Sequence, residues 1–499
     1  GEKPLYYGFC GNGVDQTFVF GSELSSFKTL KYFNNAINPK ALSQLINYGS
    51  ISAPNSIFED IFQLTPGTIL TLNSPIKGES SNLKTWWSLN SVVEKSFSKQ
   101  ICSEHEAVLI LEEALKQSIK RQSIADVPIG TFLSGGIDSS LITSLLQSQS
   151  ERKVKTFTIG FEEESFNEAP YAKEVAKYLD TDHTEIYLTS KEVQNLIPNL
   201  NSIYSEPFAD PSQIPTHLLC REVRNSGLKI ALSGDGGDEL FGGYNRYFLG
   251  ENIWKGVDLI PFKIRKFIGD FGLNISSKTL DKISPLLGVN QFGIKFHKLA
   301  KRLKYVKNEE EFYYSLISQW EDQSSIFCDD LKDPYLHRRP DSITCELPKN
   351  ISSNLTYKMM FYDTLNYLPN DILTKVDRAA MASSLETRAP FLDQNVISTA
   401  WRLSIDLKIN SNIKKNKGKV ILRKLLQKHI PPKLFMRPKV GFGIPLDDWL
   451  RGPLKSWAGD LLSEDNIKNS GYLNSEPITK LWEEHLSLKS NNCAKLWPI

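Results

Sequence analysis

A glycine-rich turn at residues 132–140 constrains the fold of this chain more than any other feature. Its sequence, FLSGGIDSS, lies between an apolar strand candidate at 129–133 and a helix candidate at 139–146. Two glycines permit a tight turn and let backbone N–H groups approach an anion. The N-terminus of the following helix adds unpaired N–H groups and a partial positive charge at the same place. The segment therefore predicts a strand, a phosphate-binding turn and a helix.

The segments that follow alternate between strand and helix patterns. Strand candidates lie at 154–159, 185–188 and 228–232, a helix candidate lies at 168–179, and helical patterns dominate from 250 onward. Such alternation indicates βαβ units and an α/β fold with a parallel sheet. Before residue 100 the chain has short strand candidates near 5–8, 18–20 and 69–72, then a Ser-, Asn- and Lys-rich stretch at 73–100 that we interpret as a linker along the surface.

The side chains of the first turn suit a nucleotide phosphate and its cation. Ser134 and Ser139 offer hydroxyl donors, and Gly135 and Gly136 offer backbone N–H groups. Asp138 would repel a phosphate unless it held a cation, so we expect it to be a Mg²⁺ ligand. The alternative is an ordinary Gly-Gly turn with a serine cap, which a lone SGG would favour.

A second glycine-rich loop, SGDGGDELFGGY at 233–244, follows the strand candidate at 228–232. Loops at the carboxyl ends of parallel strands line the ligand crevice, so the two loops are expected to meet at one ATP. Three acidic residues within five positions require compensation by a cation or a substrate group. We expect Asp238 to join Asp138 in binding Mg²⁺; the alternative is an exposed acidic turn that caps a helix.

The two loops together resemble those of a known family. The first, SGGIDSS, resembles the signature of the ATP pyrophosphatases, and its combination with SGDGGDELFGGYNRY resembles the glutamine-dependent asparagine synthetases. The likeness continues through TFTIGF at 156–161, EPFADP at 206–211, TRAPFLD at 387–393 and RPKVGFG at 437–443. It implies an α/β, parallel-sheet ATP pyrophosphatase domain of the adenine nucleotide alpha hydrolase type with added helices, preceded by a partial α+β N-terminal-nucleophile glutaminase domain.

The resemblance also assigns residues. It implies ATP contacts at Leu133, Ile159, Ser233 and Gly234, and a role for Asp235 in forming an acyl-adenylate. Lys439, in a loop bounded by proline and glycine, is the implied catalytic cation that stabilises charge on the α-phosphate. The alternative for Lys439 is a surface lysine beside a turn.

Asp371, Lys375 and Arg378 fall at i, i+4 and i+7, on one polar stripe of a helix. Periodicity alone favours a solvated face with a weak ion pair. The resemblance instead implies that Lys375 and Arg378 face ATP or the substrate carboxylate.

The first ninety residues resemble only the last part of the family's glutaminase domain. That domain uses an N-terminal cysteine whose own amine is the base, whereas Cys10 is internal. We therefore interpret 1–90 as a C-terminal remnant of the glutaminase domain plus a linker, in a chain truncated at its N-terminus. Residues 91–499 are then the synthetase domain, and this chain is not expected to hydrolyse glutamine.

The resemblance implies ATP-dependent amidation of aspartate to asparagine through β-aspartyl-AMP, with ATP and Mg²⁺ as cofactors and ammonia from glutamine in a full-length enzyme. Two alternatives stay open: a synthetase-like amidotransferase acting on another carboxylate, such as a sugar acid of a surface polysaccharide, and a non-catalytic ATP-binding regulatory homologue. A homodimer is one expected assembly.

The net charge and the cysteine spacing argue against several other classes of protein. The net charge of +2, from 59 basic and 57 acidic residues, gives no reason to expect nucleic acid or a membrane as a main partner. The six cysteines lack CxxC or zinc spacing, which favours reduced thiols in a cytoplasmic protein.

Overall fold

The computed structural model describes residues 1–11, 16–74, 81–161, 167–275, 280, 292–320, 323–331, 346–410, 418–437 and 443–499. Its first part is a small unit built on an antiparallel sheet in the order β2-β1-β3, with the bounds Thr17–Gly21, Tyr6–Cys10 and Ile61–Gln63. The helix α1 (Pro39–Tyr48) begins where the Asn38 side chain accepts hydrogen bonds from two backbone N–H groups. The hydrophobic core of this unit includes Tyr6, Leu24, Leu45 and Ile61.

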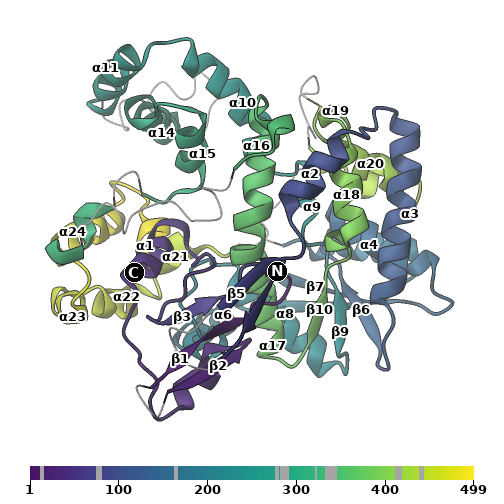
Figure 1. Ribbon diagram of the computed structural model, residues 1–499, viewed down its shortest axis with the longest axis horizontal. Coiled ribbons are helices and arrows are strands. Elements are labelled where there is room, and N and C mark those ends of the chain that lie inside the picture. Colours follow the sequence, from purple (N-terminus) through teal and green to yellow (C-terminus); the bar gives the residue numbers. More distant parts are fainter. Residues whose placement is uncertain are drawn as a thin grey trace.

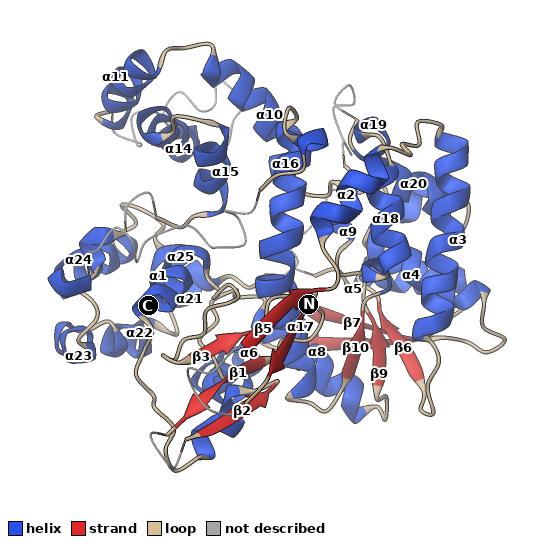
Figure 2. Cartoon of the chain, in the orientation of Figure 1, coloured by secondary structure: helices blue, strands red, loops and turns tan. Residues whose placement is uncertain are grey.

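The larger part of the chain is built on a five-stranded parallel sheet in the order β10-β9-β6-β7-β8 (Figure 2). The bounds of its strands are Glu386–Arg388, Ile230–Leu232, Ile129–Phe132, Lys155–Phe161 and Asp182–Leu188. Every residue of β7 after Lys155 is buried, as expected for a strand covered on both faces. The sheet and its helices confirm the predicted α/β class.

Two hydrophobic cores cover the two faces of this sheet. The first core takes residues from α2 (Leu89–Phe97), α3 (Glu104–Gln122), α4 (Ile137–Ser148), α5 (Ala169–Leu179), α18 (Gln394–Arg402) and α20 (Val420–Gln427). The second takes residues from α6 (Ser190–Leu196), α8 (Gln213–Asn225), α17 (Thr374–Met381) and α21 (Leu446–Arg451). A parallel sheet with a core on each face places the carboxyl ends of its strands at one shared edge.

Further helices extend from this body (Figure 1). One group comprises α10 (Asn245–Asp258), α11 (Phe262–Leu273), α14 (Phe292–Tyr305) and α15 (Glu309–Ile317). A continuous helix joins α16 (Leu355–Tyr362), a π-helical segment Asp363–Leu373 that contains Pro369, and α17. Near the end of the chain, α22 (Lys455–Leu461), α23 (Glu464–Ser470), α24 (Ser475–Leu486) and α25 (Cys493–Leu496) follow α21. Among the described residues, no helix has both the length and the apolar character needed to cross a membrane.

The fold departs from the sequence prediction in two places. The stretch interpreted as a linker contains β5 (Ser81–Thr85), which pairs with β4 (Thr68–Leu72), and then α2, which packs on α18 through buried Leu89 and Val93. The edge strand β10 was not predicted, because three residues offer too short a pattern to distinguish from the surrounding helices.

Candidate functional site

The first predicted loop follows β6 and leads directly into α4. Gly135 adopts φ +71, and a Cβ there would lie 2.9 Å from the backbone of α5, so this position requires glycine. Ser134 and Ser139 hydrogen-bond to each other through their hydroxyls at 3.0 Å, and the Gly136 N–H donates to Ser134 Oγ. Among the described residues, no side chain hydrogen-bonds to the N-terminus of α4 at its cap, which leaves a helix end suited to an anion.

The second loop follows β9, the neighbouring strand, and meets the first. A Cβ on Gly234 would lie 2.9 Å from Asp138 Cβ, and one on Gly237 would lie 2.6 Å from Asp138 Oδ1. The two loops are therefore in direct contact at the carboxyl edge of the sheet, as predicted from their positions after two strand candidates. The absence of side chains at these glycines allows the contact.

Asp138 and Asp238 come together around a lysine that the sequence reasoning missed. The Lys419 Nζ ion-pairs with both carboxylates, at 2.6 Å from Asp238 Oδ1. Lys419 is buried; burial alone would lower its pKa, but the two carboxylates outweigh this effect and raise it. It lies at the N-terminus of α20 with φ 57 and ψ 36, a left-handed backbone that is unusual for a lysine. In sequence, the only hint was a lysine directly after Gly418 at the start of a helical pattern.

The predicted Mg²⁺ site requires that the carboxylates of Asp138 and Asp238 lie close together. Asp138 and Asp238, one carboxylate from each loop, lie close enough to share one positive charge. Their carboxylate oxygens are the kind of ligand that a divalent cation such as Mg²⁺ binds. No cluster of three or more His, Cys, Asp or Glu side chains with the arrangement of a metal site occurs in the described part of the chain. A cation here would therefore take the rest of its ligands from phosphate or water.

Asp235 of the second loop and Lys375 of α17 interact electrostatically. Burial raises the pKa of Asp235, whereas the Ser233 hydroxyl and the charge of Lys375 lower it. Lys375 Nζ donates to Asp210 Oδ2 at 2.6 Å; burial opposes its charge, but Asp210 and Asp371 raise its pKa. Lys375, one of the two predicted substrate-binding cations, therefore lies close enough to Asp235 for its charge to act on that carboxyl group.

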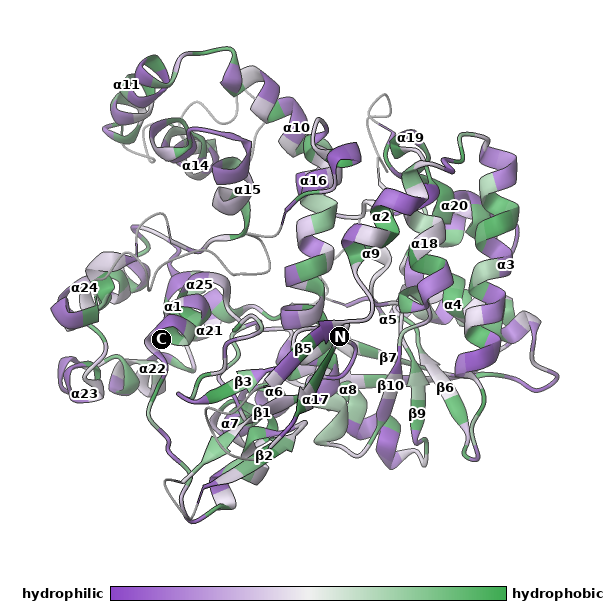
Figure 3. Ribbon diagram, viewed as in Figure 1, coloured by the Kyte–Doolittle hydropathy of each residue, from purple (hydrophilic) through white to green (hydrophobic). Residues whose placement is uncertain are grey.

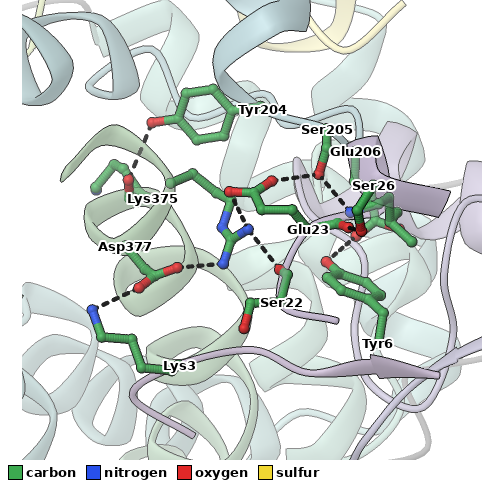
Figure 4. Close-up of polar contacts among 12 residues, drawn as sticks. Lys3, Tyr6, Ser22, Glu23, Ser26, Tyr204, Ser205, Glu206, Lys375 and Asp377 are labelled. Atoms are coloured by element: carbon green, nitrogen blue, oxygen red, sulfur yellow. Dashed lines mark hydrogen bonds and ion pairs between the residues drawn. The ribbon is translucent and has the colours of Figure 1, made fainter. Parts of the chain in front are cut away.

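Arg378 lies one turn further along α17 and contacts the first unit instead, at Ser22 and Glu23. Figure 4 labels these two residues of the first unit. The Arg378 guanidinium ion-pairs with Glu23 at 2.5 Å, donates to the Ser22 carbonyl at 2.6 Å and pairs with Asp377. Asp371, Lys375 and Arg378 are all buried. The solvated helix face that periodicity favoured is therefore wrong, because the first unit and the segment around Asp210 cover this helix.

The same junction contains a buried carboxyl group. Glu206 accepts a hydrogen bond from the Tyr6 hydroxyl at 2.9 Å (Figure 4). It also accepts one from the Ile57 N–H at 2.6 Å. Burial raises its pKa to about 7. Glu206 and Arg378 both line a small pocket between the first unit and the body.

The remaining predicted site residues lie in different environments. Leu133 and Ile159 are buried in the two hydrophobic cores, so in this conformation their side chains face away from solvent. Ser233 is buried, and its N–H donates to the Arg388 carbonyl. Lys439 lies outside the described residues. Arg437 does contact the first loop, donating to the Ser134 carbonyl at 3.1 Å.

Cys10, the first cysteine of the chain, lies inside β1 and is buried. Burial raises the pKa of its thiol, which lowers the fraction of reactive thiolate. This environment is typical of a cysteine that packs in a core.

The fold and the site define a class: an α/β domain with two glycine-rich loops in contact at the carboxyl edge of a parallel sheet, the edge where such folds bind ligands. Comparison with protein families then specifies the class further. Residues 110–499 match the asparagine synthase family, and residues 1–87 match a glutamine amidotransferase domain. The chain belongs to the asparagine synthase family.

Individual relatives agree with this assignment. The chain is 29% identical to asparagine synthetase [glutamine-hydrolyzing] 1 of Bacillus subtilis, over 100% of this chain and 72% of the relative. It is 31% identical to a putative asparagine synthetase [glutamine-hydrolyzing] of Mycobacterium bovis over 77% of this chain, but spans only 55% of that relative's length. It is also 25% identical to Amidase chry2 of Gibberella zeae, over 84% of this chain and 63% of the relative. Family membership supports ATP-dependent amidation as the reaction class.

Proposed function

We propose that this chain catalyses the ATP-dependent amidation of aspartate to asparagine through β-aspartyl-AMP. The observation that carries the proposal is the contact between the two glycine-rich loops, with Asp138 and Asp238 sharing one cation and Asp235 close by. The names of the bacterial relatives, which are asparagine synthetases, support aspartate as the acid.

In the first step, the β-carboxylate of aspartate attacks the α-phosphorus of ATP, and the bond to the β-phosphate oxygen breaks to release pyrophosphate. The N-terminus of α4 and the hydroxyls of Ser134 and Ser139 receive the phosphate groups. Asp138 and Asp238 would hold Mg²⁺, which neutralises charge on the leaving pyrophosphate. Lys375 orients the substrate through a carboxylate while Asp210 keeps it in place.

In the second step, ammonia attacks the acyl carbon and AMP leaves. The attacking nitrogen must lose a proton, and Asp235, whose pKa is raised by burial, is suited to accept it. Lys439 remains the proposed cation for the α-phosphate. The resemblance of the first unit to a glutamine amidotransferase domain supports glutamine as the source of ammonia in a complete enzyme.

A second candidate is the same chemistry on a different carboxylate, such as a sugar acid. The relative named as an amidase favours it, because that name does not specify aspartate. Pyrophosphate release measured over a panel of carboxylic acids would distinguish the two candidates.

The test is pyrophosphate release with Mg-ATP, ammonium and aspartate. Asp138→Ala should abolish release, and the matched control Asp465→Asn, an exposed carboxylate on α23, should leave it unchanged. Release that depends on another acid would move the assignment to that acid. ATP binding without release for any acid would overturn the enzymatic proposal in favour of a regulatory homologue.

A further inference from the structure

The helices α10, α11 and α14, which we call the helical arm, are held together by specific contacts. A Cβ on Gly269 of α11 would lie 2.5 Å from the Ala300 carbonyl oxygen, so the two helices meet closely at this glycine. Arg265 is buried and donates to the carbonyls of Val306 and Lys307 at the end of α14. These contacts fix which face of α11 points toward α14.

The opposite face of α11 is apolar and exposed. Ile264, Phe267, Ile268 and Phe271 lie at i, i+3, i+4 and i+7, the spacing of one helical stripe. All four side chains are exposed, and Phe267 keeps 72% of its surface accessible. Leu259, in the turn before α11, is also exposed. Within the described residues, this is a concentration of large apolar side chains that does not contribute to any of the hydrophobic cores.

The arm is also strongly basic. Residues 251–307 contain twelve Lys and Arg against four Asp and Glu, a net charge of +8. Since the whole chain carries +2, the remainder carries −6, so the balanced total conceals a local asymmetry. Lys263 and Lys266 are exposed on α11 itself, beside the apolar stripe. Figure 3 shows hydrophobic and hydrophilic residues interspersed along α11 and α14, in the part of the arm furthest from the two sheets.

We propose that the helical arm docks the protein on an anionic lipid surface through the exposed stripe of α11. A helix with a stripe of Phe and Ile flanked by lysines is the pattern of an interfacial helix, which buries its apolar face at the boundary of headgroups and acyl chains. The net positive charge of the arm complements anionic lipid, and the charge of the rest of the molecule orients the arm toward the membrane. Such docking needs no membrane-spanning helix, and none occurs among the described residues.

The nature of the stripe favours lipid over nucleic acid. Phosphate backbones are bound by exposed cations, and two phenylalanines with two isoleucines would remain in water in such a complex. On a bilayer, the same side chains leave water while Lys263 and Lys266 reach the headgroups. The docking proposal is independent of which acid the enzyme amidates.

The experiment is flotation of the full chain with vesicles of phosphatidylcholine alone or with 30% phosphatidylglycerol. We expect binding to the anionic vesicles that falls with increasing salt, and little binding to the neutral ones. Phe267→Ser combined with Phe271→Ser should lower the bound fraction about tenfold or more. The matched control is Phe20→Ser on β2, where the phenylalanine is 70% exposed but lies outside the arm.

Thermal unfolding of each variant verifies that it is folded. Equal binding by the wild type and the double variant would overturn the proposal, as would no binding to anionic vesicles or equal binding to both kinds of vesicle. A dimer of the wild type that dissociates in the double variant, without vesicle binding, would also overturn it and assign the stripe to a second copy of the chain.

Discussion

Lys408, the last residue of α19 (Ile405–Lys408), offers a sharp test of the energetics of the core. Its side chain is fully buried, and its ammonium has no hydrogen-bond partner in the described part of the chain. It lies 4.8 Å from the centroid of the Trp401 ring and 5.6 Å from that of Tyr357. Burial lowers the pKa of Lys408 from 10.5 to about 7.

The free-energy cost of burying the protonated ammonium follows from this change in pKa. Lowering a pKa from 10.5 to about 7 corresponds to about 5 kcal/mol, because each pKa unit is worth about 1.4 kcal/mol. A protonated Lys408 therefore destabilises the folded state by about 5 kcal/mol.

Because the pKa of Lys408 is lower in the folded state than in the unfolded state, the free energy of unfolding depends on pH. Between about pH 7 and 10.5 the unfolded chain keeps a proton that the folded chain has released, so the free energy of unfolding rises with pH across this window. Below pH 7 the destabilisation is fully present. Lys408→Met should thus be more stable than the wild type by about 5 kcal/mol at pH 6, and this advantage should diminish toward pH 10.5.

The assay is thermal unfolding of Lys408→Met and the wild type at pH 6, 7.5 and 9.5, where the apparent Tm at pH 6 should rise by a few degrees. Lys419→Met is the matched control, since Lys419 is also a buried lysine but has two carboxylate partners, and its loss should lower the Tm. A Tm for Lys408→Met below that of the wild type at every pH would refute the reasoning, because it would mean that the ammonium has a strongly stabilising partner.

Three further predictions concern the site and the junction. Lys419→Met should lower aspartate-dependent pyrophosphate release by about 100-fold or more, because two half-buried carboxylates then repel each other and the substrate phosphates. A rate within a few-fold of the wild type would exclude a role for this ammonium. Glu206→Gln should stabilise the protein above pH 7 and not below pH 4.5. Between these pH values the folded wild type keeps a proton on Glu206 that the unfolded chain has lost, so the free energy of unfolding of the wild type falls as the pH rises from 4.5 to 7. Urea unfolding of both proteins at pH 5 and pH 8 would measure this difference. Arg378→Met removes the cation that pairs with both Glu23 and the buried Asp377 and should destabilise the junction by about 3 kcal/mol. Limited proteolysis should then cut between the first unit and the body, and unchanged cleavage would argue against these ion pairs as the link.

Local patterns were sufficient to predict the two loops. The turn at 132–140 and the loop at 233–244 each combine glycines with a preceding strand pattern, and β6, α4 and β9 appear where these patterns placed them. The parallel topology followed from the alternation of strands and helices, and the family assignment is confirmed. Local chemistry was enough here because each loop is built within about ten residues.

Contacts between distant segments could not be predicted. Lys419 lies 281 residues from Asp138, and nothing in its own neighbourhood indicates two carboxylate partners. Lys375 and Arg378 share one helical stripe, yet one faces Asp210 and the other faces Glu23, because different parts of the fold cover successive turns of α17. The ligand roles of all predicted site residues stay predictions, as do the domain boundary at residue 90, the cytoplasmic location and the homodimer.

The left-handed backbone of Lys419 has a consequence for engineering. Glycine adopts this conformation without the cost of about 1 kcal/mol that a lysine incurs, so Lys419→Gly relieves local strain. The same change removes the ammonium that pairs with both Asp138 and Asp238. A ranking of variants by backbone preference alone would therefore favour a substitution here that measurements of stability and of turnover would both reject. Residue 419 is accordingly a position to hold fixed in any stabilised library of this protein.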